Sequence, residues 1–166
     1  MLDPERLLEL ASEEARAPSV GRPRQANLSR AVSTAYYAVF HQLLRTVATR
    51  FVPQNQWKSR VLFYRTLEHG PTRDRCKRLG QNPLPNEEQN FFGWQSFSGD
   101  LRLFAIEFVN LQELRHLADY DPENGFTLQE AQDAVTAARK AIINLRNSQD
   151  EMLVPFLSYL LFGLRR

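Results

Sequence analysis

Arg65 and His69 are the pair in this chain best suited to phosphodiester chemistry, and they stand four positions apart in a segment whose pattern predicts a helix. That spacing places two side chains on one helical face. An imidazole there could move the proton of a ribose 2′-hydroxyl while the guanidinium neutralises the charged transition state. The two residue types would suffice in principle for a metal-independent ribonuclease site. The alternative is a histidine that caps the helix end before Gly70, where the helix dipole favours a cation.

A polar stripe runs along the longest predicted helix, residues 25–51, in steps of four residues. Its members are Ser33, Tyr37, His41 and Arg45, with Arg30 beside them. Such a line could face RNA or form the seam between two subunits. The alternative is a set of buried, hydrogen-bonded side chains that join this helix to its neighbours, because polar groups inside helical bundles are normally paired.

Two more pairs at four-residue spacing, Arg115 with Asp119 and His116 with Tyr120, could orient a phosphate or form contacts within their own helix. The sequence has no glycine-rich phosphate loop, no Cys-x-x-Cys and no His-Glu-x-x-His motif. We therefore expect neither a metal nor a cofactor.

The charge is strongly sorted along the chain. The net charge of +2 hides a segment, residues 15–80, that carries thirteen bases and two acids. Its later part interleaves bases with Trp57, Phe63 and Tyr64, and this composition suits single-stranded RNA because cations pair with phosphates and aromatic rings stack on bases. A solvated basic surface is the alternative. The side chains predicted to contact RNA are Arg30, Tyr37, His41, Arg45, Lys58, Arg60, Arg73, Arg75, Lys77 and Arg78.

Apolar side chains recur at helical spacing along nearly the whole chain, so the predicted class is all-α. Residues 1–147 are expected to form one helical domain, and residues 148–166 an apolar C-terminal helix. The predicted helices are 4–16, 25–51, 56–69, 97–119 and 127–146, with a short basic helix at 72–79 and an irregular loop at 80–94.

The segment from Met152 to Leu164 contains a single polar residue. As a helix it would be about 20 Å long, which is too short for the ~30 Å of a bilayer core. We expect it to pack on the domain or on a partner subunit. A single cysteine and the lack of a basic region before an apolar stretch at the N-terminus predict a cytoplasmic protein.

Two stretches resemble the HEPN-domain family: Arg30-Ala-Val-Ser-Thr-Ala-Tyr-Tyr-Ala-Val-Phe-His41, and Arg115-His-Leu-Ala-Asp-Tyr120 before a capped, alanine-rich helix. The resemblance implies an up-and-down bundle of about five to six helices that homodimerises and engages RNA or nucleotides. Many such proteins are metal-independent endoribonucleases of defence or toxin–antitoxin systems.

Catalytic members of that family place four to six residues between an arginine and a histidine, whereas three lie between Arg65 and His69. The alternative is therefore a non-catalytic interaction module that partners a nucleotidyltransferase or another subunit.

Overall fold

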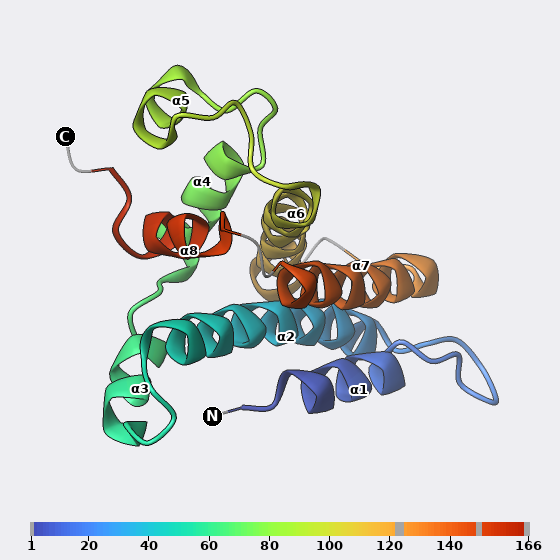
Figure 1. Cartoon of the computed structure of the whole chain (residues 1–166). Helices are drawn as coiled ribbons and strands as arrows, with labels where there is room; N and C mark the ends of the chain where they lie inside the picture. Colours follow the sequence, from blue (N-terminus) through green and yellow to red (C-terminus); the bar gives the residue numbers. More distant parts are fainter. Residues whose placement is uncertain (1, 122–124, 149–150, 165–166) are drawn as a thin grey trace.

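The computed structural model describes residues 2–121, 125–148 and 151–164, which form eight helices and no strand. The all-α prediction is confirmed, but the expected count of five to six helices is wrong. The helices are α1 Pro4–Glu14, α2 Gln25–Phe51, α3 Trp57–Tyr64, α4 His69–Leu79, α5 Asn86–Phe92, α6 Gly99–Tyr120, α7 Leu128–Asn147 and α8 Leu153–Phe162 (Figure 1).

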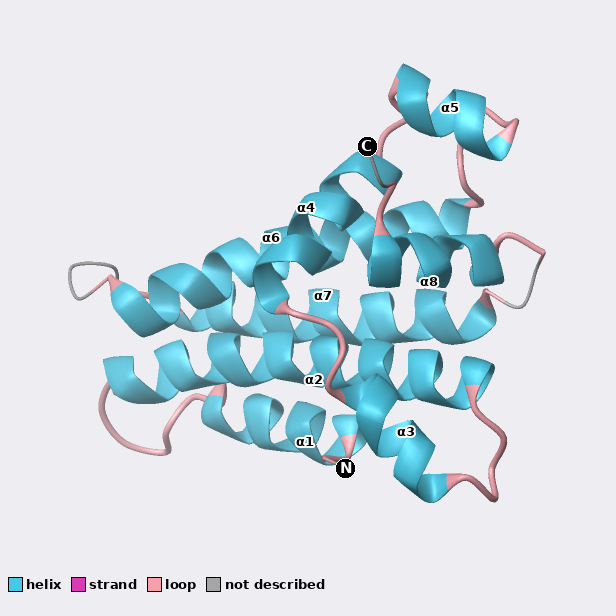
Figure 2. Ribbon diagram, turned by 90° about the vertical axis from the view of Figure 1, so that its left-hand side faces the viewer, coloured by secondary structure: helices cyan, strands magenta, loops and turns pink. Residues whose placement is uncertain are grey.

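The core lies where α2, α6 and α7 pack against one another, and α1 covers α2 on the other side (Figures 1 and 2). Small side chains let the helix backbones approach closely. Ala31, Ala35 and Ala38 on α2 are fully buried, as are Ala131 and Ala138 on α7. Burial of this apolar surface is the main driving force for folding.

α8 packs on α4, and its Phe156, Leu157 and Leu160 are fully buried. Arg75 of α4 donates hydrogen bonds to the carbonyl oxygens of Leu160 (2.7 Å) and Leu161 (3.1 Å), which have no partner within their own helix. Residues 149–150 and 165–166 of the predicted C-terminal segment lie outside the described residues. No described helix is both long and apolar enough to traverse a bilayer.

Two predicted elements differ from the structure. The helix expected over 56–69 ends at Tyr64, and His69 begins α4 instead of ending a helix. Gly70 and Pro71 fall in the first turn of α4, where proline is tolerated because its missing N–H would have no intrahelical acceptor. The segment 80–94, expected to be irregular, contains α5.

The loop from α3 to α4 passes over α2 (Figure 2). Leu67 anchors this loop because its side chain is buried in the core. The crossing brings Tyr64 at the end of α3 and His69 at the start of α4 against the polar stripe of α2.

Candidate functional site

His69 is fixed to the middle of α2. Its Nδ1 lies 2.6 Å from the hydroxyl oxygen of Tyr36, a residue that is fully buried. Tyr36 has no other side-chain hydrogen bond among the described residues, so its O–H must donate to Nδ1 to avoid a buried, unpaired donor. The neutral imidazole of His69 then carries its proton on Nε2.

Arg115 reaches the same place from α6. Its Nη2 donates to the hydroxyl of Tyr37 at 2.9 Å, and its Nε lies 2.6 Å from a carboxylate oxygen of Asp119. The guanidinium carbon also lies 5.5 Å from the ring centre of Tyr37 and 5.3 Å from that of Tyr120. The predicted contact between Arg115 and Asp119 is confirmed, and Arg115 in addition connects α6 to the stripe of α2.

His41 completes the group. Its Nδ1 forms a hydrogen bond with the hydroxyl of Tyr64, and the two rings stack with centres 5.5 Å apart. The ring centre of Tyr37 lies 6.5 Å from that of His41 and 5.9 Å from that of His69. We call the six residues the histidine–arginine cluster: Tyr36, Tyr37, His41, Tyr64, His69 and Arg115.

Both imidazoles in the cluster are held neutral. Burial lowers the pKa of His69 below its usual 6.5, and the positive charge of Arg115 lowers this pKa further. Burial, followed by the proximity of His69, lowers the pKa of His41. Arg115 is therefore the permanent cation of the cluster near neutral pH, with Asp119 as its counter-ion.

Arg65 does not join His69 on a helical face. It follows the last residue of α3, its side chain is exposed, and it forms no side-chain hydrogen bond or ion pair with the described residues. The arginine whose charge acts on His69 is Arg115. Sequence spacing could not pair them because they are brought together by the packing of α4 and α6.

The stripe on α2 joins the helices, as one of the two interpretations predicts. Tyr37 binds Arg115 of α6 and His41 binds Tyr64 of α3. Arg45 is exposed, yet it lies close enough to Tyr64 for its charge to act on that hydroxyl.

Most of the predicted RNA-contacting bases have partners within the fold. Arg30 pairs with Glu14, Arg60 donates to the carbonyl of Val52, Arg73 pairs with Asp74, Arg75 holds α8, and Arg78 pairs with Glu87 and Glu88. Within the described part of the chain, three have exposed side chains that form neither hydrogen bonds nor ion pairs: Arg45, Lys58 and Lys77.

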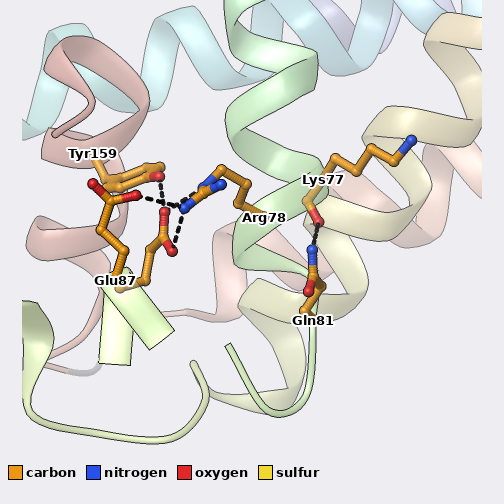
Figure 3. Close-up of polar contacts among 6 residues, drawn as sticks. Lys77, Arg78, Gln81, Glu87 and Tyr159 are labelled. Atoms are coloured by element: carbon orange, nitrogen blue, oxygen red, sulfur yellow. Dashed lines mark hydrogen bonds and ion pairs between the residues drawn. The ribbon is translucent and has the colours of Figure 1, made fainter. Parts of the chain in front are cut away.

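The contacts of Arg78 are structural. Glu88 of α5 is fully buried and accepts hydrogen bonds from Arg78 of α4 and Tyr159 of α8. Figure 3 shows Arg78 directed toward Glu87 and Tyr159. Burial would raise the pKa of Glu88, but these hydrogen bonds hold it below its usual range. Burial, together with the neighbouring Glu88, raises the pKa of Tyr159 to about 12. The network therefore ties α5 and α8 to α4.

Groups that could coordinate a metal do not gather anywhere in the described residues, since no three His, Cys, Asp or Glu side chains are suitably placed. Cys76 is fully buried, and burial raises the pKa of its thiol, which disfavours the nucleophilic thiolate. Comparison with known proteins gives no significant match, whether to a family model, a curated protein or a solved structure.

Proposed function

We propose that the protein is a cytoplasmic, HEPN-like RNA-binding protein that holds a backbone phosphate of single-stranded RNA at the histidine–arginine cluster. The observation that carries the proposal is the convergence of His41, His69 and Arg115 from three different helices. Guanidinium groups and N–H donors are the usual protein ligands of phosphate oxygens.

The chemistry of each group supports this role. Arg115 provides a permanent charge, and the Nε2–H of His69 is a neutral donor that remains available near pH 7. Exposed Arg45, Lys58 and Arg65 on or beside α2 and α3 would contact the neighbouring phosphates. The strand would then run from the cluster across the corner formed by these two helices.

The proposal extends to metal-independent cleavage, as in a ribonuclease of a defence or toxin–antitoxin system. With Nδ1–H donated to Tyr64, Nε2 of His41 would hold the lone pair that accepts the 2′-hydroxyl proton. The 2′-oxygen then bonds to phosphorus, the bond from phosphorus to the 5′-oxygen breaks, and that oxygen takes a proton from water. The hydroxide left behind takes the proton held on Nε2 of His41. Arg115 would stabilise the extra negative charge of the transition state.

The test is fluorescence anisotropy of a labelled single-stranded oligoribonucleotide in EDTA. Arg115→Gln should weaken binding about tenfold, the loss expected for one charged hydrogen bond. Arg139→Gln, an exposed arginine on α7, is the matched control and should bind normally. Equal affinities for the two variants would overturn the proposed binding site.

Cleavage is tested separately on a gel with the same oligonucleotide. His41→Asn should abolish cleavage in EDTA even at protein concentrations that saturate the oligonucleotide. Cleavage that requires a metal ion, or the absence of cleavage by the wild-type protein, would reject the ribonuclease mechanism. The RNA-binding proposal would then stand without it.

A second candidate function, a non-catalytic module that binds another protein such as a nucleotidyltransferase, is favoured by one surface. A pocket of about 370 Å³ lies between α5 and α8, with the exposed rings of Phe91 and Phe162 among its walls. Exposed aromatic patches of this kind mark interaction sites. Sedimentation velocity tests the form of this candidate in which the partner is a second copy of the chain: the wild type should sediment as a dimer and Phe162→Ser as a monomer.

A further inference from the structure

A pocket of about 310 Å³ opens between α1 and α2, directly beside the histidine–arginine cluster. Its walls are Leu2, Leu7, Leu10, Thr34, Tyr37 and His41. The volume lies at the lower end of the range for small-molecule sites, so it suits one ring system and not a large ligand. Two of its walls, Tyr37 and His41, also belong to the cluster.

We infer that this pocket holds a nucleobase whose phosphate lies at His69 and Arg115, an inference that rests on the proposed RNA-binding function. Aromatic rings and apolar side chains bind unpaired bases by stacking, and such stacking tolerates different base sequences. The pocket presents both kinds of surface, with leucines from α1 facing the rings of Tyr37 and His41 from α2.

The rings of Tyr37 and His41 suit a stacked base because they are uncharged and held in place. Burial lowers the pKa of His41, so its imidazole is neutral near pH 7 and costs little to cover with an apolar ligand. The hydrogen bonds from Arg115 to Tyr37 and between His41 and Tyr64 fix both rings in place before a ligand arrives. A preformed site loses less entropy on binding.

Tyr37 connects the two halves of the site. Its ring lines the pocket, while its hydroxyl accepts the hydrogen bond from Arg115 and its ring lies 5.9 Å from that of His69. A single nucleotide can therefore place its base against the ring of Tyr37 and its phosphate near the hydroxyl of Tyr37. The hydroxyl oxygen of Thr34, whose O–H donates to Glu14 at 3.5 Å, can accept a hydrogen bond from the edge of the base.

The experiment compares adenosine 5′-monophosphate with ribose 5-phosphate, using isothermal titration calorimetry on the full chain. The nucleotide should bind at least about tenfold more tightly, because it adds the stacked base. Leu10→Trp should fill the pocket and reduce nucleotide affinity to that of ribose 5-phosphate, whose own binding should not change. Leu103→Trp is the matched control, since Leu103 is a half-exposed leucine on α6 outside the pocket.

The outcomes separate the two proposals. If ribose 5-phosphate binds and the nucleotide binds no better, the base pocket is wrong and the phosphate site stands. If neither ligand binds, both proposals fail. Methyl NMR signals of Leu7 and Thr34 in the wild-type protein provide a measurement independent of Leu10→Trp folding. They should shift with the nucleotide and not with ribose 5-phosphate, and equal shifts would overturn the inference.

Discussion

The hydroxyl of Tyr36 lies 2.6 Å from Nδ1 of His69, so the first residue of α4 is tied to a fully buried position in the middle of α2. The contact fixes the orientation of the imidazole and leaves its Nε2 edge to point away from Tyr36. Phe40 packs against the same imidazole, with ring centres 4.1 Å apart. The position of the proposed phosphate donor is therefore determined by the core.

Tyr36→Phe should cost about 1 kcal/mol of unfolding free energy, the usual net value of one hydrogen bond. It should also raise the pKa of His69 toward its usual value, because an O–H that donates to Nδ1 stabilises the neutral imidazole. Urea unfolding and NMR titration of the imidazole signals check the two effects. Tyr64→Phe is the matched control, since it should affect mainly His41, and an unchanged pKa of His69 in Tyr36→Phe would contradict the role given to this hydroxyl.

The stability of the protein should fall as the pH drops below 6.5. The unfolded chain binds protons at both histidines with their usual pKa of 6.5, whereas burial lowers the folded-state pKa of His41 and His69. The unfolded state therefore binds more protons below that pH, and protonation favours unfolding. Urea unfolding from about pH 7.5 to pH 5 measures the slope of unfolding free energy against pH. This slope should be flatter in His69→Gln. A slope that is the same in this variant would show that other groups control acid stability.

Glu88→Gln should destabilise the protein by about 1.5–3 kcal/mol, because the variant leaves Arg78 and Tyr159 without their buried carboxylate. Glu87→Gln is the control; its carboxylate is 46% exposed and pairs with the same arginine, so the loss should be below about 1 kcal/mol. Urea unfolding at neutral pH provides both values. Equal losses would mean that burial of Glu88 does not govern the attachment of α5.

Arg75→Met should loosen α8, because the variant removes the donor to the carbonyls of Leu160 and Leu161. Amide hydrogen exchange by mass spectrometry should then become faster in α8 than in α7. Lys77→Met is the control, since this exposed side chain on the same helix forms no hydrogen bond with the described residues. Unchanged protection of α8 would show that its apolar face alone holds it.

Sequence patterns predicted the long elements well. The expected 25–51 helix is α2 itself, and the capping box at Thr127 and Glu130 opens α7 as its residues indicate. These helices are defined by their own apolar stripes and end signals. Two short features were missed because tertiary contacts stabilise them. α5 is a seven-residue helix held through Glu88, and the break after Tyr64 is fixed by Leu67 in the core.

The candidate site was predicted in part. His69, His41 and Tyr37 were identified from their residue types and spacing, and all three belong to the cluster. The arginine that acts on His69 was misassigned because spacing within one segment cannot report how α6 packs against α4. The four-residue spacing from Asp119 marked Arg115 as able to orient a phosphate, but nothing in the sequence linked it to His69.

The internal partners of the basic side chains limit how many counterions the protein can release when it binds RNA. Of the eight bases predicted to contact RNA, only Arg45, Lys58 and Lys77 have neither a hydrogen bond nor an ion pair among the described residues. Each phosphate contact on a single strand contributes about −0.7 to the slope of log affinity against log salt. The proposed contacts of Arg45, Lys58, Arg65 and Arg115 should therefore give a slope of about −3, compared with about −6 if all eight predicted bases bound RNA. Most of these basic side chains therefore stabilise contacts within the fold and do not add to the affinity for a polyanion.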